Sequence, residues 1–106
     1  MSSDNKSQST KEWVNIVDPF AKKLIENYLL RREDDLSLLR TSLENGNFEE
    51  IRVKGHNLSG SGSAYGLDRI SEIGKNLEQA AEGGDATALV LHIDTLEKYL
   101  KKLRIS

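Results

Sequence analysis

The sequence has 106 residues, of which 37% are hydrophobic and 30% are charged, and its formal net charge is -2. This composition is typical of one globular domain with its own core, not of a disordered chain. The absence of cysteine excludes disulfides and thiolate metal sites, and with only two histidines besides we expect no metal site. Positive charge is not concentrated on one face, so nucleic-acid binding is not expected.

No apolar run approaches the roughly 20 residues of a membrane span. The first residues also lack the apolar stretch of a signal peptide. We therefore expect a cytoplasmic protein that does not associate with a membrane. Residues 1–10 are polar and aperiodic, and we expect them to form a disordered tail before a single domain at residues 11–106.

A short apolar segment at residues 11–17 predicts a helical turn that docks on the domain. Asp18 and Pro19 then mark the start of a long helix, because aspartate accepts a backbone N–H at a helix N-cap and proline suits the first helical position. This helix is expected to run to about Glu44, where Asn45-Gly46 ends it. Its apolar residues recur at helical spacing: Ile25, Leu29, Leu36, Leu39 and Leu43.

Asn47 is expected to cap a second helix, with Glu50 at the capping-box position. The buried stripe of this helix comprises Phe48, Ile51, Gly55, Leu58 and Gly62. A third helix is expected after Gly66, and its apolar residues are Leu67, Ile70, Ile73, Leu77, Ala80 and Ala81. Asp85 is expected to cap a fourth helix, which buries Leu89, Ile93, Leu96, Leu100 and Leu103. Short connections and the lack of strand signals predict an all-α, antiparallel up-down four-helix bundle with a short extra N-terminal helix or turn.

The stretch GHNLSGSGSAYG, residues 55–66, concentrates poor helix formers around a histidine. On a helical wheel His56 lies about 130° from the centre of the buried stripe, so we expect it to face solvent. Gly55 and Gly62 lie on the stripe and would let helices approach closely, whereas Gly60 has no packing reason to be glycine. Small side chains would thus clear a surface around a nucleophilic imidazole. A plain glycine- and serine-rich loop is the alternative interpretation.

The segment VKGHNLSGSGSAYGLDRISEIGKNLEQAA resembles the signature of histidine phosphotransfer (Hpt) domains of bacterial-type phosphorelays. That signature has a histidine, then a leucine and two glycines, which here are His56, Leu58, Gly60 and Gly66. Matches in the next helix are Ile70, Gly74, Leu77 and Glu78, and the EGGD turn also fits. The resemblance extends from about residue 18 to residue 103. It implies a four-helix bundle whose exposed histidine carries phosphoryl groups.

By this resemblance His56 is the phosphoacceptor, through Nε2. The residues expected to support it or to keep it accessible are Asn57, Ser59, Gly60, Ser63 and Gly66. The family usually has a basic residue three positions after the histidine, where this sequence has Ser59. Arg52 or Lys54 could supply the missing charge.

The resemblance also implies the partners, which would be response-regulator receiver domains, a hybrid histidine kinase, or both. The protein would be a monomeric phosphocarrier and not an enzyme with a free substrate. It would need no cofactor, because Mg²⁺ would sit in the partner receiver domain. A starting methionine and a complete set of helices favour a free-standing protein.

Two alternatives stay open from the sequence. One is a helical adaptor in which His56 is not phosphorylated, and the other is the dimeric phosphoacceptor module of a histidine kinase. His92, the second histidine, is expected to have a structural or solvent role.

Overall fold

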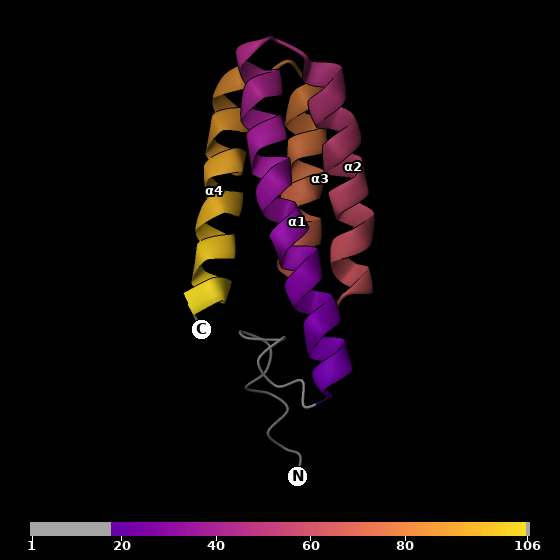
Figure 1. Ribbon diagram of the computed structural model, residues 1–106. Helices are drawn as coiled ribbons and strands as arrows, with labels where there is room; N and C mark the ends of the chain where they lie inside the picture. Colours follow the sequence, from indigo (N-terminus) through magenta and orange to yellow (C-terminus); the bar gives the residue numbers. More distant parts are fainter. Residues whose placement is uncertain (1–17, 106) are drawn as a thin grey trace.

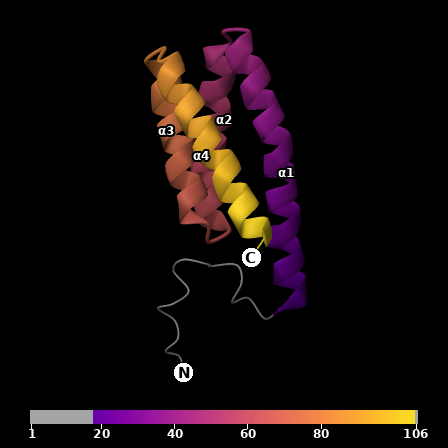
Figure 2. The same cartoon turned by 90° about the vertical axis from the view of Figure 1, so that its left-hand side faces the viewer.

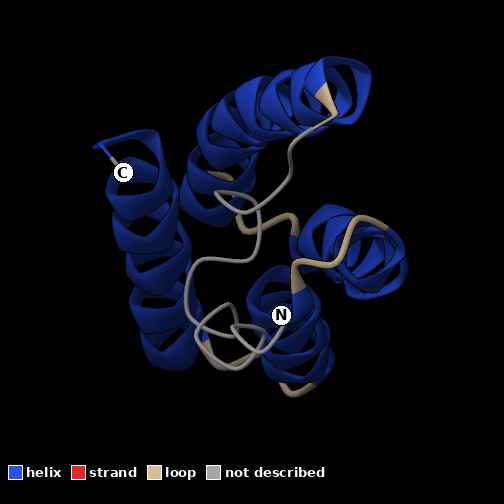
Figure 3. Cartoon of the chain, turned by 90° about the horizontal axis from the view of Figure 1, so that it is seen from below, coloured by secondary structure: helices blue, strands red, loops and turns tan. Residues whose placement is uncertain are grey.

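The computed structural model describes residues 18–105, which form the helices α1 (Pro19–Glu44), α2 (Phe48–Ala64), α3 (Asp68–Glu82) and α4 (Ala86–Ile105). Consecutive helices run antiparallel and pack in cyclic order, with α4 returning to α1 (Figure 1). Seen from below, the helices stand at four corners (Figure 3). The predicted all-α up-down four-helix bundle is confirmed. The expected tail at residues 1–10 and the expected helical turn at 11–17 lie outside the described residues.

Helix boundaries follow local hydrogen bonds that the sequence predicts. The Asp18 carboxylate accepts a bond from the backbone N–H of Phe20 at 3.0 Å, and Pro19 is the first residue of α1. Asp85 likewise accepts from the N–H of Ala88 at 3.0 Å at the start of α4. Each cap satisfies one of the backbone donors that the first helical turn leaves unpaired.

Only one of the two hydrogen bonds of the expected capping box forms at the start of α2. Asn47 Oδ1 does accept from the backbone N–H of Glu50 at 3.1 Å. The Glu50 carboxylate, however, accepts from Ser42 Oγ at 2.6 Å and from Asn47 Nδ2 at 3.3 Å. It does not reach the backbone N–H of Asn47, because that group already donates to the carbonyl of Ser42 at 2.8 Å. Glu50 therefore ties the end of α1 to the start of α2.

Each of the three turns contains a glycine with positive φ, a conformation that side chains with a Cβ rarely adopt: Gly46, Gly66 and Gly84. The core formed by the four helices is aliphatic apart from one tyrosine, and it comprises Ile25, Tyr28, Leu29, Leu39, Ile51, Leu58, Leu67, Ile70, Ile73, Leu77, Ala81, Leu89, Ile93, Leu96, Leu100 and Leu103. Leu36, Leu43, Phe48 and Ala80, which were predicted to be buried, are only partly so.

The closest packing in the bundle is between α2 and α3, and glycines make it possible. A Cβ on Gly74 would lie 2.6 Å from the backbone nitrogen of Ser59 and 2.7 Å from the carbonyl oxygen of Gly55. A Cβ on Gly62 would lie 2.6 Å from the backbone nitrogen of Ser71. The expectation that Gly55 and Gly62 allow close approach is thus confirmed, and Gly74 is the matching glycine on α3. This contact fixes the register between the two helices.

α1 is the longest helix, and its first turns run past the end of the other three (Figure 2). Phe20, in the first of these turns, is 71% exposed. Further along, α1 packs between α2 and α4. There Arg40 forms ion pairs with Asp94 and Glu97 of α4, the former at 3.0 Å.

Candidate functional site

His56 lies near the middle of α2, on the flank that borders α3 and faces solvent. Its side chain is 71% exposed, as the wheel predicts. The ring nitrogen Nδ1 lies 3.2 Å from Glu78 Oε2 on α3. An ionised carboxylate can only accept a hydrogen bond, so this contact requires the proton on Nδ1. In the neutral ring the lone pair is then on Nε2, which is free to act as a nucleophile.

The face of α2 that follows His56 in sequence carries small residues, so it does not rise above the imidazole. Gly60, one turn further along α2, is exposed, and a Cβ placed on it would have no atom within 4 Å. Ser63 forms hydrogen bonds with Ser71 of α3, from its backbone N–H at 2.7 Å and between the two hydroxyls at 2.9 Å. Ser59 is half-buried between these features. A folded partner can therefore approach the imidazole without displacing large side chains.

The two cations proposed from the sequence both have carboxylate partners. Arg52, one turn before His56, donates to both carboxylate oxygens of Glu49 at 3.0 and 2.6 Å. These hydrogen bonds raise the pKa of the Arg52 guanidinium, and they lower the pKa of the Glu49 carboxyl. Lys54 forms an ion pair with Asp35 of α1 at 3.1 Å. Asp35 is buried and also lies 2.8 Å from Arg32.

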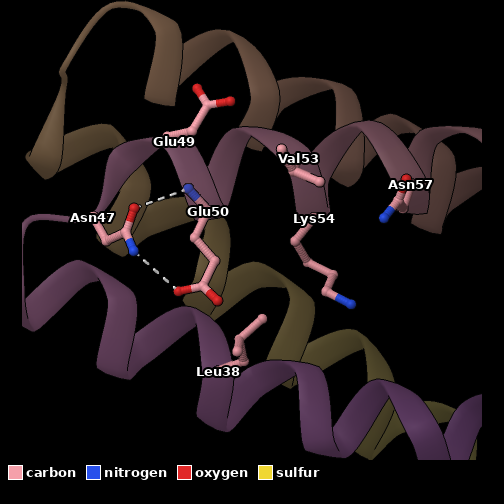
Figure 4. Close-up of a pocket in the computed structure, with 7 residues that line it drawn as sticks. All are labelled: Leu38, Asn47, Glu49, Glu50, Val53, Lys54 and Asn57. Carbon is pink, nitrogen blue, oxygen red and sulfur yellow. Dashed lines mark hydrogen bonds between the residues drawn. The ribbon is translucent and has the colours of Figure 1, made fainter.

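Lys54 and Asn57 lie on the flank of α2 that borders α1, away from Glu78 and the imidazole. They line a shallow groove of about 440 Å³ together with Leu38, Asn47, Glu49, Glu50 and Val53. Figure 4 shows the Lys54 side chain pointing from α2 toward α1. The structure thus places neither residue on the α3 side of α2, where His56 contacts Glu78.

Residues 23–105 match the family of the Hpt domain. The chain belongs to the Hpt domain family. Hpt domains serve histidine phosphotransfer in phosphorelays, where they are phosphocarriers that interact with receiver and kinase domains. Neither a curated protein nor a solved structure matches the sequence.

Gly66 of the Hpt signature and its neighbour Tyr65 lie away from the imidazole surface. Gly66 lies in the turn after α2 with φ of +75°, so the turn itself requires a glycine there. Tyr65 stacks on Tyr28 of α1 with ring centroids 4.2 Å apart, and Tyr28 donates or accepts a hydrogen bond with Ser61 at 2.7 Å. Both features anchor the end of α2 in the Hpt bundle.

Glu78 is the site residue that the sequence alone did not assign. The sequence identifies Glu78 only as a match to the family signature. Its contact with His56 depends on the register between α2 and α3. His92, by contrast, is half-buried on α4 and lines a groove with Asn76 and Gln79 of α3.

Two further findings concern the described part of this Hpt domain. Within residues 18–105 there is no group of three or more histidine, aspartate or glutamate residues placed to hold a metal ion. None of the helices in that range has both the length and the apolar character needed to cross a membrane.

Proposed function

We propose that this protein carries a phosphoryl group on Nε2 of His56 between the receiver domains of a two-component phosphorelay. The observation that carries this proposal is the exposed imidazole, whose Nδ1 is held by Glu78 at 3.2 Å and whose Nε2 side is open. Membership in the Hpt family supports the same function. The partners would be receiver domains of response regulators, of a hybrid histidine kinase, or both, and the protein would act as a cytoplasmic monomer.

In the transfer step, Nε2 attacks the phosphorus of an aspartyl phosphate on the receiver. The Nε2–P bond forms as the O–P bond breaks, and the receiver regains its free carboxylate. The imidazole becomes positively charged, and its Nδ1–H donates a charge-assisted hydrogen bond to Glu78. A second receiver reverses the step when its carboxylate attacks phosphorus and neutral imidazole leaves.

The Hpt chain contributes position and access, which dominate phosphoryl transfer once the reacting groups are in line. Mg²⁺ would be bound in the receiver and not in this chain. Among the supporting residues proposed from sequence, Ser59 lies on the α3 side of α2 and can offer a hydroxyl to the phosphoryl oxygens. Gly60 and Ser63 keep the approach open. Asn57 borders the other flank of α2, so we assign it no contact with the phosphoryl group.

The experiment that tests this function incubates the chain with a panel of purified receivers, each phosphorylated beforehand. We expect at least one receiver to transfer label to the chain, and the label to be stable in base and labile in acid, as a phosphohistidine is. A helical adaptor would bind a receiver without taking label. Gel filtration of the same samples separates a monomeric carrier from a dimeric kinase module.

Gly60→Gln should slow transfer from that receiver by about tenfold, because a side chain there points back along α2 toward His56 and blocks the approach. The same change should raise the free energy of unfolding by roughly 0.5–1 kcal/mol, since glycine disfavours a helix interior. The measurements are the transfer rate and a urea unfolding curve. A variant that is less stable but transfers at the wild-type rate would contradict the access role of Gly60.

A further inference from the structure

A phosphoryl group on His56 would create an electrostatic problem at this site. The phosphoryl oxygens would carry about 1.5 to 2 negative charges, which the positive charge on the ring offsets only in part, next to the Glu78 carboxylate. Glu82 lies one turn further along the same flank of α3. A nearby cation would therefore stabilise the phosphorylated form. Arg52 is paired with Glu49 and also interacts electrostatically with Glu78 and Glu82, so it offsets their charge only in part. Lys54 is bound to Asp35 on the opposite flank.

The register between α2 and α3 shows which residue of α3 lies near His56 and could supply this charge. Ser71 of α3 contacts Ser63 of α2, and Glu78 contacts His56. The helices are antiparallel, so a step of one turn forward from Ser71 to Lys75 corresponds to a step of one turn back from Ser63 to Ser59. Lys75 is thus the residue on α3 opposite Ser59, one turn from His56. The neighbouring Gly74 confirms that this part of α3 lies opposite Ser59, since a Cβ on Gly74 would touch the backbone nitrogen of Ser59.

The surroundings leave the Lys75 ammonium available. Lys75 is exposed, and among the side chains that the structure describes none lies within ion-pair distance of it. Glu72, the acidic residue one turn before it, is paired with Arg69 at 2.8 Å. Ser59 lies opposite Lys75, and a Cβ on the nearby Gly60 would have no atom within 4 Å, so a long side chain on α3 has space to extend over the exposed edge of the α2–α3 contact toward His56.

We propose that Lys75 on α3 is the cation that binds the phosphoryl group carried by His56. Lys75 supplies from the neighbouring helix the charge that Ser59 cannot supply from α2. This assignment rests on the proposed phosphocarrier function. It predicts that Lys75 stabilises phosphorylated His56 more than the bare ring, because only the phosphorylated ring carries the added negative charge.

The test measures the equilibrium ratio of phosphorylated Hpt chain to phosphorylated receiver, with the receiver that labels the wild-type protein. Lys75→Ser should lower this ratio by about two- to five-fold at low ionic strength, the range of an exposed ion pair. Lys98→Ser is the matched control, because it removes the same charge from an exposed position on α4 and should leave the ratio unchanged. The ratio reports the relative stability of the two phosphorylated proteins, so slower docking alone would not move it.

The exchange variant Ser59→Lys/Lys75→Ser places the ammonium on α2 instead of α3, at the same level of the helix pair, and should restore the ratio. High salt should reduce the difference between wild type and Lys75→Ser, since exposed charges are screened. Equal ratios for Lys75→Ser and Lys98→Ser would overturn the assignment of Lys75 and leave the phosphocarrier function intact. If no receiver labels the wild-type chain, the phosphocarrier function itself is contradicted, and the assignment falls with it.

Discussion

Replacement of His56 by glutamine is expected to abolish phosphoryl transfer and to leave the bundle folded. The amide of glutamine is no substitute for the imidazole lone pair, so no phosphorylated intermediate can form. The side chain is 71% exposed and contacts only Glu78 among the interactions described, and surface substitutions of this kind usually change stability by less than about 0.5 kcal/mol. Label incorporation and thermal unfolding followed by circular dichroism measure the two effects.

His92→Gln is the matched control for this prediction. It removes the other histidine of the chain, which is half-buried on α4, and it should retain full transfer. Retention of label in His56→Gln, or label on the ring of His92, would show that His56 is not the acceptor. A His56→Gln variant that unfolds would be uninformative by itself, so the melting curve is part of the test and His56→Asn provides a second variant.

The largest expected loss of stability comes from Gly74→Ala. A Cβ at this position meets the backbone of α2 at 2.6 and 2.7 Å, and neither atom belongs to a flexible side chain. The helices α2 and α3 must therefore move apart, at a cost of roughly 1–3 kcal/mol for an overpacked contact. In a domain of this size each kcal/mol lowers the melting temperature by about 4–8 °C.

Gly60→Ala separates this packing effect from the intrinsic helix propensity of alanine. Gly60 is also inside a helix, but a Cβ there has open space around it. We expect Gly60→Ala to raise the free energy of unfolding by about 0.5–1 kcal/mol, opposite in sign to Gly74→Ala. Unfolding in urea compares the two variants. A free energy of unfolding that is unchanged or raised in Gly74→Ala would mean that the α2–α3 contact does not depend on Gly74.

The fold could be predicted from the sequence because its signals are local. Asp18, Asn47 and Asp85 lie directly before apolar stripes of helical period, and each of them caps the expected helix. The Glu50 prediction failed in part because its carboxylate found a nearer donor, the hydroxyl of Ser42 at the end of the preceding helix. A capping box is judged within one helix, whereas this contact depends on how two helices meet.

Only the features of the site that depend on α2 alone could be predicted from the sequence. The exposure of His56 and the open space at Gly60 follow from the wheel of α2. Glu78 and Lys75 belong to α3, and their positions depend on the register that the glycine contact sets. The same limitation affected Lys54, which is close to His56 in sequence but pairs with Asp35 of α1.

The central claim is that His56 accepts the phosphoryl group through Nε2 because Glu78 occupies Nδ1. The most direct measurement is NMR of the ¹⁵N-labelled chain after transfer from a phosphorylated receiver, with detection of the coupling between ³¹P and the ring nitrogens. We expect one phosphorylated ring, that of His56, with phosphorus on Nε2 and a proton retained on Nδ1. Phosphorus on Nδ1 of His56, on the ring of His92, or on neither histidine would contradict the account.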